Sequence, residues 1–167
     1  MGILNNNSEE WKKMTEGLEE VKKKRGQIIT WALEIEELLE GILSNYFMKG
    51  TTPESRAFFE VEIMRNMNFE QKVQIFEKVA HREKYDSDKL SLIIKAIKNI
   101  QDKRNKVAHW RTLSFLQTGE VLLRKKNEIE KKEMLSLSKE ILEKLEMDKE
   151  IAFQEIIIFH QWFQSLK

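Results

Sequence analysis

The chain has no cysteine, and only one proline and six glycines occur among its 167 residues. The lack of cysteine excludes disulfide bonds and thiolate metal sites, and it favours a reducing compartment such as the cytoplasm. The scarcity of helix-breaking residues, together with many Glu, Lys, Leu and Ile, favours helix. The composition therefore predicts an all-α fold, and the pattern of helix starts and apolar spacing described below predicts a helical bundle of about five helices.

Long apolar runs and a strong excess of one charge are also lacking. No run approaches the ~20 apolar residues of a membrane-spanning helix. The first residues, MGILNNNSEE, contain neither the basic region nor the apolar core of a secretion signal. We therefore expect a cytoplasmic protein without membrane contact. The net charge is only +1, whereas proteins that wrap duplex DNA are usually strongly basic. Any contact with nucleic acid should be local, and we expect the basic clusters at 22–25 and 124–126 to be solvated helix faces.

Apolar residues recur at steps of three and four from Trp11 to Tyr46, which is the spacing of one helix face. Only Arg25, beside Gly26, interrupts this stripe. The pattern predicts either one very long helix or two helices that meet at a bend there. Further helix starts are predicted at Thr52-Pro53, at Asn68 and at Asp86.

The pattern changes after residue 111. Apolar residues alternate over 112–124 around Thr118-Gly119, which predicts a small β-hairpin inserted after the preceding helix. Helical spacing resumes over 137–166, either unbroken or bent at Asp148. We expect residues 1–167 to form a single domain in which residues 1–7 are a flexible tail.

The stretch QDKRNKVAH, residues 101–109, stands at the end of an apolar-periodic helix. On a regular helix, Arg104 and His109 point about 140° apart, so they can meet at one anion only if the helix ends near His109. Arginine offers phosphate a planar, permanently charged fork. Histidine can move protons near neutral pH, and Asn105 could hold the imidazole or a phosphate oxygen. These three side chains suit phosphodiester chemistry that needs no metal.

Structural roles are the alternative for each of these residues. Arg104 could be a surface arginine, and His109 could cap the helix, where the dipole favours it. We expect His81 to be structural or exposed, and His160 to be packed in the core or at an interface. No arrangement of histidines and carboxylates predicts a metal site or a cofactor. Most of the tryptophans should lie in the core or an interface, but Trp110 is a candidate for the wall of a cleft.

The residues from Arg104 to His109 resemble the R-x4–6-H motif of HEPN (higher eukaryotes and prokaryotes nucleotide-binding) domains. The preceding NFEQKVQIFEKV, residues 68–79, is similar to the helix before the motif helix in many bacterial members. The resemblance implies an all-helical HEPN-like domain that pairs with itself and assigns Arg104, Asn105 and His109 as catalytic. The inserted hairpin departs from the family pattern.

In active HEPN domains the motif belongs to a metal-independent ribonuclease, and many toxins and antiphage effectors are built this way. We therefore expect an endoribonuclease that uses the RNA 2′-hydroxyl, leaves 2′,3′-cyclic phosphate ends and acts as a homodimer with a composite site. RNA and an antitoxin or regulatory protein are the expected partners. The candidate RNA contacts are Lys103, Lys106, Trp110 and Arg111. The alternative is a non-catalytic HEPN module that binds a nucleotide or a partner protein.

Overall fold

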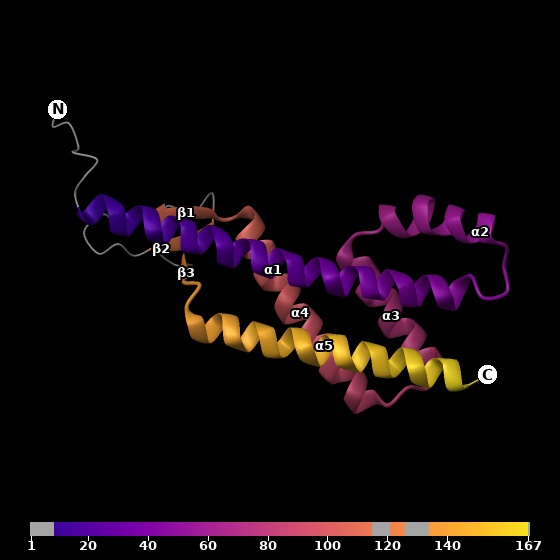
Figure 1. The fold of residues 1–167 in the computed structure, drawn as a ribbon. Helices are drawn as coiled ribbons and strands as arrows, with labels where there is room; N and C mark the ends of the chain where they lie inside the picture. The colour runs from indigo at the N-terminus through magenta and orange to yellow at the C-terminus, as the bar shows by residue number, and fades with distance from the viewer. Residues whose placement is uncertain (1–8, 115–120, 126–133, 167) are drawn as a thin grey trace. The chain divides into compact units, whose positions relative to one another are not determined.

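A computed structural model describes residues 9–114, 121–125 and 134–166 of the chain. Five α-helices and a small three-stranded sheet make up this described part (Figure 1), which confirms the all-α bundle with a small hairpin. The expected tail at residues 1–7 lies outside the described residues. The helices are α1 (Glu9–Phe47), α2 (Pro53–Phe58), α3 (Phe69–Arg82), α4 (Ser87–His109) and α5 (Lys139–Ser165). The strands are β1 (Arg111–Ser114), β2 (Val121–Arg124) and β3 (Met134–Leu135).

The helix starts follow from local hydrogen bonds that the sequence predicted. Thr52 accepts from the Ser55 backbone N–H at 3.3 Å, with Pro53 as the first helical residue. Asn68 caps α3 in a reciprocal pair with Gln71, and the Asp86 carboxylate accepts the backbone N–H groups of Asp88 and Lys89. Each cap satisfies backbone donors that have no partner within the helix.

The two long helices at the ends of the chain are unbroken. α1 continues through Gly26, so of the two alternatives that the sequence left open, the single long helix is the one that forms. α5 continues through Asp148, whose carboxylate accepts a hydrogen bond from Asn99 Nδ2 at 3.2 Å. None of the helices in the described part of the chain combines the length and the apolar character that crossing a bilayer requires.

The chain divides into two compact units. One comprises residues 1–30 and 102–144, and the other comprises residues 31–101 and 145–167. Helices α1, α4 and α5 each contribute a segment to both units. The expectation of a single domain over 1–167 stays a prediction.

The first unit contains the antiparallel sheet, in the order β1-β2-β3. Leu123 lies opposite Thr112 on one side and Leu135 on the other, and it is fully buried. The predicted hairpin is therefore correct for β1 and β2 but incomplete, because β3 adds a third strand. The predicted turn at Thr118-Gly119 lies outside the described residues.

The second unit has an aromatic and aliphatic core. Phe76 of α3 packs edge-on against Phe159 of α5, with ring centroids 4.9 Å apart. Lys72 of α3 is buried as well, because Glu36 and Glu40 of α1 hold its ammonium group at 2.6 and 2.5 Å. Burial alone would lower the pKa of Lys72, but the two carboxylates outweigh it and raise this pKa above its usual value.

Between α2 and α3 the chain does not form a regular α-helix. The predicted helix from Pro53 to Met64 begins as α2, widens into a π-helix, η1 (Phe59–Ile63), and tightens into a 3₁₀ turn, η2 (Met64–Asn66). Only Met64 in the whole stretch from Pro53 to Asn66 is buried.

Candidate functional site

The three motif residues lie on the last two turns of α4. Asn105 and His109 are exposed, Arg104 is half-buried, and Val107 between them is fully buried. Val107 thus anchors the helix end while the polar side chains stay accessible. α4 ends at His109, and the Trp110 backbone N–H donates to the Lys106 carbonyl at 2.9 Å. The helix end predicted near His109 is therefore confirmed.

Asn105 bonds to the arginine of the motif and lies on the same helix face as the histidine. Asn105 and His109 are four residues apart and share a helix face, whereas Arg104 points about 100° away from Asn105. The Arg104 guanidinium bridges this angle, because its Nη1 donates to Asn105 Oδ1 at 3.1 Å. With Oδ1 engaged, the Nδ2 group of Asn105 can donate to a phosphate oxygen. Asn105 thus supports the arginine in this chain.

One carboxylate organises the lysines that we expected to contact RNA. Asp102 lies 3.0 Å from the ammonium group of Lys106 and 3.7 Å from that of Lys103. Lys106 also stands over the Trp110 ring, 5.7 Å from its centroid. The main role of Lys106 is therefore to hold the end of the helix in place. Its charge is only partly available to a ligand. Arg111, at the start of β1, is exposed.

Arg25 and Lys24 of α1 fasten the segment that follows the motif. Arg25 Nη1 donates to Thr112 Oγ1 at 3.1 Å, and Lys24 Nζ donates to the Leu137 carbonyl at 2.8 Å. The expectation of a solvated helix face over 22–25 holds for Lys22 and Lys23 and is wrong for these two residues. The sequence did carry a signal: Arg25 occupies a position of the apolar stripe.

Strand pairing brings a second arginine beside Arg111, which follows the motif directly. Arg111 of β1 stands directly opposite Arg124 of β2, and cross-strand neighbours of like charge repel one another. Within residues 9–114, 121–125 and 134–166, no carboxylate forms an ion pair with either guanidinium. The expectation of a solvated helix face at 124–126 is wrong for Arg124, which is a half-buried strand residue. This pair concentrates positive charge two residues after His109, which suits an anionic ligand.

The other histidines have different surroundings. His81 is exposed at the end of α3 and lines a groove of about 520 Å³ with residues of α4. His160 of α5 is half-buried, and its Nδ1 atom has no hydrogen-bond partner among the described residues. The part of the chain that the structure describes contains no group of three or more His, Asp or Glu side chains placed to hold a metal ion.

Comparison with protein-family models, with curated proteins and with solved structures finds no match to this chain. The function must therefore be argued from the residues and their geometry.

Proposed function

We propose that this protein is a metal-independent endoribonuclease of the HEPN type, acting as a homodimer in which two copies of the motif form one site. The observation that carries the proposal is the grouping of Arg104, Asn105 and His109 at the accessible end of α4. Among the described residues, Arg104 bonds to a neutral amide and forms no ion pair with a carboxylate, so its charge remains available to a phosphate. The resemblance to the HEPN motif supports the same assignment.

The chemistry needs two proton transfers and one charge stabiliser. A histidine takes the proton of the RNA 2′-hydroxyl, whose oxygen attacks the adjacent phosphorus. The bond from phosphorus to the 5′-oxygen breaks, and a second group, acting as a general acid, protonates that oxygen. The products are a 2′,3′-cyclic phosphate and a 5′-hydroxyl. Arg104 stabilises the charged phosphorane through its planar fork.

A second copy supplies the group that one chain lacks. Each motif contains a single histidine, so one chain has a base or an acid but not both. A two-fold axis places identical motifs face to face. The same arrangement doubles the local arginine charge, which suits RNA despite a net charge of only +1 per chain.

The biological setting that fits is toxin or antiphage defence in the cytoplasm. A ribonuclease with an accessible site must be restrained until it is needed, and an antitoxin or regulatory protein would do so by covering the end of α4. This setting rests on the family resemblance.

One observation favours a second candidate, a non-catalytic module that binds a nucleotide or a protein. The hydrogen bond within the motif joins Arg104 to Asn105 and does not include His109. A phosphate clamp needs the guanidinium and the amide but no group that titrates.

Incubation of mixed RNA with purified protein in EDTA tests the proposal. Wild type should cleave RNA, leave 2′,3′-cyclic phosphate ends and spare DNA. His109→Ala should be inactive yet folded, and His160→Gln is the matched control that should keep the wild-type rate. If wild type cuts no RNA, nucleotide binding decides for the second candidate: Arg104→Ala should abolish it, and His109→Ala should only weaken it.

A further inference from the structure

The segment of residues 53–63, formed by α2 and η1 and called the arm below, leaves most of its apolar side chains exposed in the described structure. None of its residues is buried, and Phe58 is 64% exposed, with Val61 and Ile63 above 40%. The cap at Thr52 and the proline at the first position nonetheless define its start well. An ordered amphipathic helix with exposed aromatic and aliphatic side chains indicates an interaction surface.

The arm has an attached face and a free face. On the attached face, Phe59 packs against Phe47 of α1 with ring centroids 6.0 Å apart, and Arg56 bonds to Glu60 and to Asn45. On the free face, Phe58 lies between Glu54 and Glu62, which are four residues before and after it.

Both of these acids remain available as charges. Among the described residues, no Lys or Arg side chain forms an ion pair with Glu54 or Glu62. The backbone N–H of Glu54 and the side chain of Thr52 hold the pKa of Glu54 below its usual value, so this carboxylate is ionised at neutral pH. The free face is therefore an exposed aromatic ring flanked by two negative charges.

A groove between α3 and α4 has complementary chemistry. Leu90 and Ile94 form its apolar floor. Lys95 and Lys98 of α4 and Glu77 of α3 are its charged lining residues, so the groove carries two positive charges and one negative charge. Both lysines are exposed, and neither pairs with a carboxylate in the described ranges. The groove follows α4 from Ser87 to Asn99, a length of about 18 Å. The eleven residues of the arm span a similar length, about 16 Å as a helix.

The arm does not cover the groove of its own chain. Both belong to the unit of residues 31–101 and 145–167. In Figure 1, α2 lies on one side of the C-terminal half of α1, and α3 lies on the other side. The groove thus remains open to an outside helix.

We propose that the groove receives the arm of a second copy of this chain, and that the two copies exchange arms reciprocally around a two-fold axis. Phe58 seats on Leu90 and Ile94, and whichever of Glu54 and Glu62 then lies toward the C-terminal end of α4 pairs with Lys95 and Lys98. Reciprocal exchange makes the contact twice and closes the dimer, so no open chain of molecules forms. The contact goes beyond the proposed ribonuclease activity and does not depend on it.

Light scattering and sedimentation of the full chain measure this contact directly. Wild type should have about twice the 20.0 kDa mass of one chain. Phe58→Ala should raise the dimer dissociation constant by about 30-fold or more, as expected for an aromatic anchor. Because Phe58 is mostly exposed in one chain, the Phe58→Ala variant should still fold. The circular dichroism spectrum of this variant should therefore match that of wild type.

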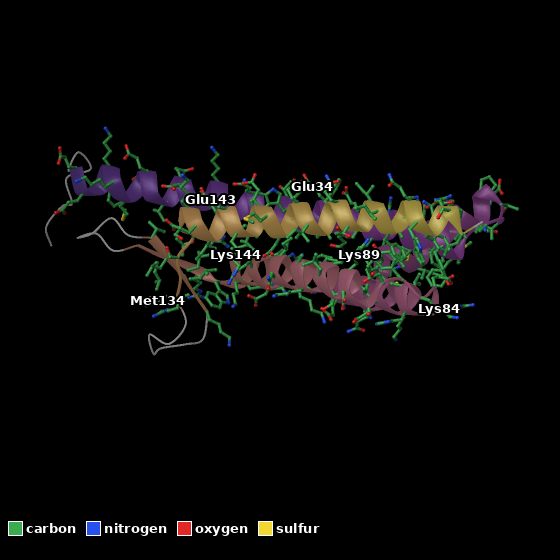
Figure 2. All side chains as sticks on the ribbon, turned by 90° about the horizontal axis from the view of Figure 1, so that it is seen from below. Glu34, Lys84, Lys89, Met134, Glu143 and Lys144 are labelled. Atoms are coloured by element: carbon green, nitrogen blue, oxygen red, sulfur yellow. The ribbon has the colours of Figure 1, made fainter. Side chains whose placement is uncertain are left out.

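Charge exchange gives the sharper test. The arm variant, Glu54→Lys with Glu62→Lys, and the groove variant, Lys95→Glu with Lys98→Glu, should each weaken the dimer about tenfold or more. Mixed together, they should form a heterodimer as tight as wild type, because both contacts then join opposite charges. Lys84→Glu with Lys89→Glu is the matched control outside the groove, and both lysines are labelled in Figure 2.

Three outcomes would overturn the proposal. Wild type is a monomer at all concentrations, or the groove variant dimerises like wild type, or the mixed variants fail to associate. An arm that packs only on another arm would respond to the arm variant and not to the groove variant. None of these readouts involves RNA, so they are independent of whether the motif cleaves it.

Discussion

At the scale of single residues, Arg104 differs from the neighbouring lysines in the kind of group that it contacts. Asp102 neutralises part of the charge of Lys103 and Lys106, whereas Arg104 is held by the neutral amide of Asn105. Arg104→Lys should therefore lower kcat/KM for a defined RNA oligonucleotide by about 100-fold, although the charge is kept. A lysine offers a point charge where a phosphorane needs a planar, two-pronged donor.

Two variants make this comparison specific. Asn105→Ala removes only a supporting hydrogen bond, so it should reduce the rate about five- to tenfold. Arg82→Lys makes the same change at an exposed arginine near the end of α3 and should leave the rate unchanged. If Arg104→Lys keeps more than a third of the wild-type rate, charge alone suffices and the two-pronged role is wrong.

At the scale of elements, α1 contains a glycine in its interior, where glycine lowers the stability of a helix. Gly26 is exposed, and a Cβ atom built there would meet no other atom within 4 Å. Gly26→Ala should raise the free energy of unfolding by about 0.5–1 kcal/mol, because alanine loses less backbone entropy in a helix. Urea unfolding followed by circular dichroism measures this difference.

Gly50 provides the contrast within the same chain. A Cβ atom there would also meet no neighbour, but its φ of +73° lies in the left-handed region. Gly50→Ala should therefore lower the free energy of unfolding by about 1 kcal/mol. A Gly26→Ala variant that is less stable than wild type would contradict the expectation for Gly26.

At the scale of the whole molecule, a site built from two motifs predicts that a wild-type chain loses its activity when it pairs with an inactive chain. Wild type equilibrated with a ninefold excess of His109→Ala should fall to about a tenth of its activity per wild-type chain. The reason is that only one partner in ten then carries the second histidine. Cleavage at saturating RNA measures this effect.

A second excess variant separates pairing from competition for RNA. The double variant His109→Ala with Phe58→Ala has the same motif as the single His109→Ala variant. It lacks the aromatic anchor of the arm. Its excess should lower the wild-type activity less than an excess of the single His109→Ala variant does, because the mixed dimer then keeps only one of its two Phe58 contacts. Unchanged activity with the single His109→Ala variant would instead mean that one chain cleaves RNA alone.

The sequence by itself determined those features that depend on residues close together in the chain. The caps at Thr52, Asn68 and Asp86 were predictable because a cap bonds to backbone groups two or three residues away. The apolar stripe of α1 and the helix end at His109 followed from periodicity for the same reason. The grouping of Arg104, Asn105 and His109 on one helix end was also local, and its role in cleavage stays a prediction.

Only the tertiary structure decided which side chains are covered and which charges are paired. Lys72 is buried and Phe58 is exposed, which is the reverse of their usual preferences. Two glutamates of α1 surround the lysine, whereas none of the described elements covers the free face of the arm. Arg25 reaches Thr112, and β3 completes the sheet, across long stretches of sequence. Such contacts depend on how segments that are apart in the sequence meet in the fold. The spacing of neighbouring residues does not predict them.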